Sequence, residues 1–202
     1  MRHQQWTTED WKRVVWSDET KINRISSDGL RYAWVSSDDP LQTARVEPTV
    51  KFGGGNVMVW GCMTWAGVGG LAQVVGRMDS AQYMDILGSK LVPTLEALAL
   101  LPDYPHQDQL IYRQDNDSEH TSRATRAWFE AKGIQPMEWP AQSPDLNPIE
   151  HFWAHLKRKL ASYPEQAKGV HQMWERVQAE WPKTAVETCQ ALIESMPREL
   201  RP

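Results

Sequence analysis

Three acidic residues follow or begin predicted elements in a way that could bring their carboxylates together. Asp18 follows a strand-like run over 11–16, Asp115 follows another over 109–114, and Glu150 lies in the first turn of a predicted helix. Active sites of open α/β sheets form where strands end. We therefore expect Asp18, Asp115 and Glu150 to converge from three separate elements.

A set of carboxylates is typical of magnesium sites, because Mg²⁺ does not need cysteine or histidine ligands. Mg²⁺ binds through carboxylates, water and phosphate oxygens. Three carboxylates can hold two ions, which promote in-line displacement at a phosphodiester, with water as the nucleophile for cutting or a DNA 3′-OH for joining. The sequence therefore predicts a two-Mg²⁺ site, in which Mn²⁺ can substitute, with Asp18, Asp115 and Glu150 as metal ligands and catalytic residues.

Each acid also has a structural interpretation. The chain holds 26 acidic residues, and an aspartate after a strand is commonly a turn residue. Asn147 and Glu150 have the spacing of a capping box. On a helical wheel, however, Glu150 lies about 100° from Ile149, beside the apolar stripe, where it could reach the edge of the core.

The elements that must position these acids are predicted from periodicity and turn residues. Asp79 should begin a helix with a capping box at Gln82, and Pro93 should kink or split that helix. Gly133 should end a helix over 118–132. Asn147 and Pro148 should begin a helix reaching Leu160, with its core stripe at Ile149, Phe152, Trp153, Leu156 and Leu160. Strands are expected over 11–16, 30–35, 57–65, 71–75, 109–114 and 134–139.

Two further amphipathic segments follow residue 163. Their apolar stripes are Val170, Trp174, Val177 and Trp181, and then Val186, Cys189, Ile193 and Met196. The element order predicts an α/β fold, one mixed sheet with flanking helices. We expect a core over 1–162 and C-terminal helices over 163–202 packed on it in the same domain. Most tryptophans should be core residues: Trp16, Trp34, Trp60, Trp153, Trp174 and Trp181.

Composition restricts the function classes. The 202 residues carry a net charge of −4, which argues against phosphate binding by a basic surface. Two cysteines cannot form a disulfide framework and fit a reducing, intracellular compartment. The N-terminus lacks a signal-peptide core, and no apolar stretch approaches a membrane span. Secretion and membrane insertion are not expected.

Four segments resemble the Tc/mariner superfamily of DDE transposases: VVWSDETKI (14–22), VKFGGGNVMVWGCM (50–63), QDNDSEHTS (114–122) and EWPAQSPDLNPIEHFWAHLKR (138–158). The similarity runs from about Trp11 to Arg198. The SPDLNPIE motif and the 34 residues between Asp115 and Glu150 point to the Tc branch.

This resemblance implies an RNase H-like fold and assigns the family's three metal-binding acids to Asp18, Asp115 and Glu150. It implies a nuclear transposase that could act as a homodimer. Such an enzyme cuts double-stranded DNA at the inverted repeats of its element and joins the 3′ ends to target DNA, usually at TA steps.

Supporting residues are less specific. His120 matches a family histidine and could hold a carboxylate or the scissile phosphate, or it could be a solvated residue on a helix surface. Lys157 begins a basic run that could contact DNA phosphates or form a solvated face. Ser118 and Glu119 replace the proline and lysine common in the family, which places an acid near Asp115.

Relatives carry an N-terminal helix-turn-helix region, and no such region precedes Trp11. Specific DNA binding is therefore expected to be weak, and the negative charge would reflect the missing basic region. The alternative is a truncated or domesticated, catalytically inactive remnant that acts by binding only. A standalone RNase H-like nuclease would keep the metal chemistry but gives no reason for SPDLNPIE.

Overall fold

The computed structural model describes residues 5–24, 55–102, 104–105, 109–138 and 147–199. Several segments used in the sequence analysis lie outside these residues: the predicted strand over 30–35 with Trp34, the start of the segment over 50–63, and the first half of SPDLNPIE.

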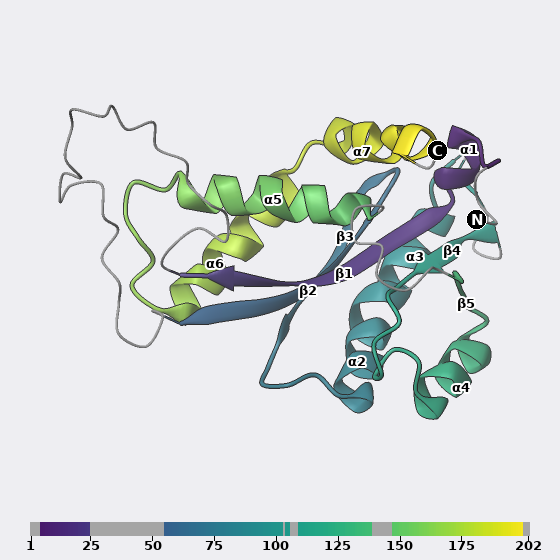
Figure 1. Ribbon diagram of the computed structural model, residues 1–202, viewed down its shortest axis with the longest axis horizontal. Coiled ribbons are helices and arrows are strands. Elements are labelled where there is room, and N and C mark those ends of the chain that lie inside the picture. The colour runs from purple at the N-terminus through teal and green to yellow at the C-terminus, as the bar shows by residue number, and fades with distance from the viewer. Residues whose placement is uncertain (1–4, 25–54, 103, 106–108, 139–146, 200–202) are drawn as a thin grey trace, which may run out of the picture.

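A five-stranded mixed sheet forms the centre of the molecule (Figure 1). The strand order is β3-β2-β1-β4-β5. Strands β1 (Val14–Asn23), β2 (Asn56–Thr64) and β3 (Gly67–Val74) form an antiparallel meander, while β4 (Ile111–Arg113) and β5 (Gln135–Pro136) continue the sheet in parallel to β1. The prediction of one mixed sheet with flanking helices is confirmed.

The first strand begins and ends later than predicted. Trp11 belongs to a short helix, α1 (Thr8–Trp11), because Thr7 and Asp10 form a capping box. Strand β1 then continues through polar residues to Asn23, since β2 pairs with it as far as Asn56. Asp18 therefore lies inside a strand and not beyond its end, which corrects the prediction.

One face of the sheet is covered by α2 (Ser80–Ile86), α3 (Val92–Ala99) and α4 (Arg123–Lys132) (Figure 1). Asp79 caps α2 by accepting a hydrogen bond from the Gln82 backbone N–H at 2.9 Å, but the Gln82 side chain donates to Val75 O instead of closing the capping box. The apolar stripe of this helical segment is buried: Tyr83, Leu87, Leu91, Leu95 and Leu98.

The helical path does not break at Pro93. A π-helical turn, η3 (Leu87–Leu91), joins α2 directly to α3. Proline lacks an N–H and its ring crowds the carbonyl one turn earlier, and a wider turn can relieve that crowding. The predicted kink or split is thus replaced by a local change of pitch.

Helix α4 begins later than predicted. Ser122 is its N-cap and accepts from the Thr125 backbone N–H at 3.1 Å, so residues 118–122 form turns before the helix. Gly133 ends α4 with a φ of 64°, a left-handed conformation that glycine adopts without strain, as predicted.

The other face is covered by α5 (Pro148–Ala161), α6 (Val170–Glu180) and α7 (Val186–Glu199), with a 3₁₀ turn, η6 (Trp181–Lys183), between the last two. The α5 stripe is buried as predicted, while Val170 and Val186 are exposed and Met173 takes a core position. Trp181 packs 5.0 Å from Phe152 and 5.2 Å from Trp153 between ring centroids. In the described part of the chain, no helix is both long and apolar enough to cross a bilayer.

Candidate active site

Strand register delivers Asp18 and Asp115 to one region. Strands β1 and β4 run parallel, and their last pair is Trp16 with Arg113. Asp18 and Asp115 each follow two residues later in the chain. The two carboxylates therefore leave neighbouring parallel strands at the same level, as the sequence predicted for Asp115.

Alternation along β1 sends neighbouring acids to opposite faces of the sheet. Trp16 belongs to the core beneath α5, α6 and α7, whereas Val15 belongs to the core beneath α2 and α3. Because side chains alternate along a strand, Asp18 lies on the α5 face and Glu19 on the α2 face.

Asp18 is a largely buried acid. Its side chain is 11% exposed, and within the described residues its Oδ2 atom makes no hydrogen bond. Its Oδ1 atom lies 4.0 Å from Nη1 of Arg113. Burial, and then the charge of Glu150, raises the pKa of Asp18 to about 8, although Arg113 opposes this shift.

Arg113 is the buried cation of this region. Its side chain is 4% exposed, and Nη1 donates to the Ser17 carbonyl at 3.2 Å. Burial lowers the pKa of the guanidinium, while the charges of Asp18, Asp115 and Glu150 act in the opposite direction. One cation thus interacts electrostatically with all three predicted ligands. Sequence analysis missed this residue, although an arginine in an otherwise apolar strand was a signal.

Glu150 occupies the first turn of α5 and is exposed. The capping-box interpretation is wrong, because the Asn147 side chain makes no capping hydrogen bond and its Oδ1 atom is buried without a hydrogen-bond partner among the described residues. Glu150 instead acts electrostatically on Asp18.

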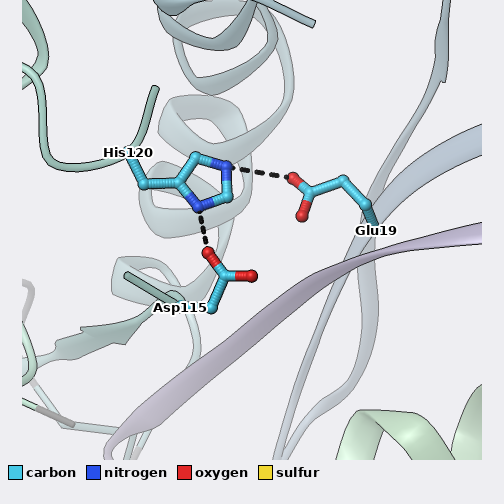
Figure 2. A group of neighbouring side chains, drawn as sticks. All are labelled: Glu19, Asp115 and His120. Atoms are coloured by element: carbon cyan, nitrogen blue, oxygen red, sulfur yellow. Dashed lines mark hydrogen bonds and ion pairs between the residues drawn. The ribbon is translucent and has the colours of Figure 1, made fainter. Parts of the chain in front are cut away.

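The His120 ring lies between two carboxylates, as Figure 2 shows. Its Nδ1 atom contacts Oδ1 of Asp115, and its Nε2 atom lies 3.5 Å from Oε1 of Glu19. The backbone N–H of Asp117 donates to the same Asp115 oxygen at 3.1 Å. Among the described residues, Glu19, Asp115 and His120 are the group whose ligand atoms lie close enough together to hold a metal ion. Of the three predicted ligands, this group contains only Asp115.

His120 is a core residue and not the solvated helix-surface histidine of the alternative prediction. It is 2% exposed, and its ring packs on Tyr83 at a centroid distance of 4.0 Å. Burial acts to lower its pKa, but its interactions with the carboxylates of Asp115 and Glu19 prevail and raise it to about 10. Correspondingly, burial raises the pKa of Asp115, but interactions with His120 lower it below the ordinary value.

A chain of buried hydrogen bonds connects the backbone of His120 to the sheet. Ser17 Oγ lies 2.6 Å from the Tyr112 hydroxyl, which lies 3.0 Å from the Tyr83 hydroxyl. Tyr83 donates to Gln114 Oε1 at 2.6 Å, and Gln114 Nε2 donates to the His120 carbonyl at 3.2 Å. The chain joins β1, β4 and α2 to the turn that carries His120.

Packing closes the other side of Asp18. Gly61 is its partner on β2, and a Cβ atom at Gly61 would lie 2.6 Å from the Trp181 ring and 2.7 Å from the Trp153 ring. Glycine therefore allows two indoles to approach the sheet beside Asp18. Lys157 lies about two turns beyond Glu150 on α5 and is half-buried; its contact with DNA stays a prediction.

Residues 13–172 match the family model described as DDE superfamily endonuclease. The chain belongs to this family. It is 36% identical to the transposable element Tcb1 transposase of Caenorhabditis briggsae, over 99% of this chain and 70% of that protein. It is 35% identical to the Tc1 transposase of Caenorhabditis elegans, over 97% of this chain and 68% of that protein. Membership of the Tc/mariner superfamily is thereby confirmed.

The fold of this DDE family member is also found in Mos1 transposase. A pre-cleavage Mos1 transpososome matches with a TM-score of 0.77 at 20% identity, over 98% of this chain. The chain spans 56% of that Mos1 chain. The Mos1 catalytic domain solved with raltegravir and Mg matches with a TM-score of 0.68 at 18% identity, over 94% of this chain and 81% of that one. The RNase H-like fold is therefore confirmed.

Proposed function

We propose that this chain is the catalytic part of a DNA transposase, a metal-dependent endonuclease and strand transferase. Asp18, Asp115 and Glu150 are its proposed metal ligands. The observation that carries the proposal is the state of Asp18: a largely buried carboxylate on which Glu150, Glu19 and Asp115 all act electrostatically, and whose Oδ2 atom has no hydrogen bond among the described residues.

The donor set fits a hard divalent cation. All three proposed ligands offer oxygen atoms, which suit Mg²⁺ or Mn²⁺. The Arg113 guanidinium opposes the shift in the pKa of Asp18, but burial and the charges of three acids outweigh it. A bound divalent ion would supply the missing positive charge, and a pair of ions would activate the attacking oxygen and stabilise the leaving one.

The protein's own groups would prepare this chemistry. Strand β1 holds Asp18 in fixed register, and α5 brings Glu150 from a separate element. Trp153 and Trp181 exclude water from the sheet beside Asp18, which strengthens electrostatic interactions there. The buried positive charge of Arg113 would partly offset the mutual repulsion of the three carboxylates.

The proposed substrate is double-stranded DNA at transposon ends. One matched Mos1 structure is a paired-end complex with the left transposon end, and the matched nematode proteins are named as transposases of transposable elements. Target joining at TA steps, a homodimer and a nuclear location are further proposals, drawn from the family alone.

Nicking of supercoiled plasmid by the 202-residue chain tests the function. With Mg²⁺ or Mn²⁺ we expect nicking that falls more than about 100-fold in Asp115→Asn and in Glu150→Gln, because ligand loss costs at least as much as loss of a supporting residue. The matched control is Glu130→Gln, an exposed acid on α4, which should nick as the wild type does.

Two outcomes would overturn the catalytic proposal. Nicking that survives both ligand substitutions would come from another site or a contaminant. Absence of nicking by a wild-type chain that still binds Mn²⁺ and DNA would favour the catalytically inactive remnant.

A further inference from the structure

Glu19 is an acid that the proposed reaction does not use. It follows Asp18 in β1 but lies on the α2 face of the sheet, so it cannot share the position of Asp18. Its Oε1 atom is buried, makes no hydrogen bond within the described residues, and lies 3.5 Å from Nε2 of His120. An acid at this depth requires a charged or polar neighbour, and the His120 ring is that neighbour.

The His120 ring has little freedom to move. It is packed on the Tyr83 ring, and its backbone carbonyl accepts from Gln114. The preceding residue is fixed as well, since Thr125 Oγ1 donates to the Glu119 carbonyl at 2.6 Å. Both ring nitrogens point at carboxylates, as Figure 2 shows. The ring is therefore a rigid link between Glu19 and Asp115.

The link acts on one oxygen of Asp115 only. Oδ1 accepts from the Asp117 backbone N–H and contacts the His120 ring. In the described part of the chain, every side-chain hydrogen bond of this carboxylate goes to Oδ1. Fixing Oδ1 sets the rotation of the carboxylate and leaves Oδ2 for another partner.

We propose that Glu19 and His120 are positioning residues, which orient Asp115 from the opposite face of β1 so that Oδ2 is presented to a divalent cation shared with Asp18 and Glu150. This inference rests on the proposed function. Carboxylate–histidine pairs behind a metal ligand fix the ligand's orientation, and their loss typically weakens metal binding about 10–100-fold.

Binding of Mn²⁺ to the 202-residue chain tests the proposal without DNA or turnover. The free Mn²⁺ signal in electron paramagnetic resonance gives the affinity. We expect Glu19→Gln and His120→Gln each to weaken binding about 10-fold or more. The double variant should lose little beyond either single one, because the two residues act through one contact chain.

The chain offers a matched control in a second His–Glu pair. His171 and Glu175 lie 3.4 Å apart on α6, but both are exposed. Glu175→Gln should bind Mn²⁺ as the wild type does. Circular dichroism checks that each variant is folded. Should Glu19→Gln fail to fold, Glu19→Asp replaces it, since the shorter side chain keeps the charge but withdraws the carboxylate from His120.

The outcomes separate the two proposals. A wild-type chain that binds no Mn²⁺ overturns the proposed function and this inference with it. A wild type that binds, together with folded Glu19→Gln and His120→Gln variants of equal affinity, overturns the positioning role alone. Nitrogen couplings in the electron spin echo spectrum of bound Mn²⁺ would also overturn it, because they would make His120 a direct ligand.

Discussion

At Asp18, burial and neighbouring negative charge act against ionisation in the metal-free protein. The pKa of Asp18 rises from 3.8 to about 8 in the fold, so the folded state loses stability as pH rises from about 4 to 8. Functional sites often carry such a cost to stability, and removing it stabilises the fold.

Asp18→Asn should therefore stabilise the metal-free chain at pH 8. We expect a gain of about 0.5–2 kcal/mol, or a rise of about 2–4 °C in melting temperature for each kcal/mol. Thermal unfolding in EDTA measures it. Near pH 4 the gain should vanish, because Asp18 is then protonated in the wild type. A lower melting temperature for the variant at pH 8 would contradict this account.

The contribution of His120 to folding stability is favourable, unlike that of Asp18, and it is largest at low pH. Its pKa rises from 6.5 in the unfolded chain to about 10 in the fold, so its contribution to stability is complete below about pH 6.5 and is lost as pH approaches 10. Near pH 6 we expect the free energy of unfolding of the wild type to exceed that of His120→Gln by about 1.5–3 kcal/mol, a value typical of hydrogen bonds to charged groups. The difference should close near pH 10 in urea unfolding. His171→Gln, at an exposed pair, should show no such difference at any pH.

At the scale of elements, β2 and the helices above it meet at Gly61. Gly61→Ala would place a methyl group 2.6 Å from Trp181 and 2.7 Å from Trp153, both large and buried. We expect a loss of about 1–3 kcal/mol from overpacking. Mn²⁺ binding should weaken as well, because Asp18 is paired with this residue. Urea unfolding and Mn²⁺ titration measure the two effects.

Gly88→Ala is the matched control for Gly61→Ala. A Cβ at Gly88 would meet only the Trp128 ring, at 3.9 Å, an ordinary contact. This substitution in a helical turn should be neutral or stabilising by about 0.4–1 kcal/mol, since alanine restricts the unfolded chain. If both variants lost equal stability, the close approach of the indoles at Gly61 would not be the cause.

Local signals determined how well each element could be predicted. Pro148 and Gly133 mark a helix start and a helix end through their own backbone preferences, so both positions are correct. Strand β1 was misjudged because its polar half, including Asp18 and Glu19, is held by pairing with a distant strand. No local pattern records that pairing.

The candidate site shows the same limit. Motifs identified Asp18, Asp115 and Glu150 because each lies in a recognisable segment of the chain. Arg113 and Glu19 were missed, since their roles depend on which face of the sheet each side chain occupies and on what packs there. The burial of His120 depends on Tyr83, 37 residues earlier in the chain.

At the scale of the whole molecule, the candidate site joins the two helical layers. Asp18 lies on the α5 face with Glu150, whereas Glu19 and His120 lie on the α2 face with Tyr83. Helices α6 and α7 share the core of β1 and α5, with Val177, Cys189 and Ile193 among its buried residues. We therefore expect one cooperative unit, in which the region over 163–202 does not unfold separately.

Coincident unfolding transitions test that unit. Far-UV circular dichroism reports all helices, while tryptophan fluorescence is weighted toward the α5 face, where Trp153 and Trp181 lie. Both probes should give the same midpoint. Mn²⁺ at 100 times its dissociation constant should stabilise the folded chain by about 2.7 kcal/mol. It should shift both midpoints equally, because a ligand that binds between the layers stabilises only the state in which both layers are folded. Two separate transitions, with only one shifted by Mn²⁺, would divide the chain into independent parts and confine the site to one of them.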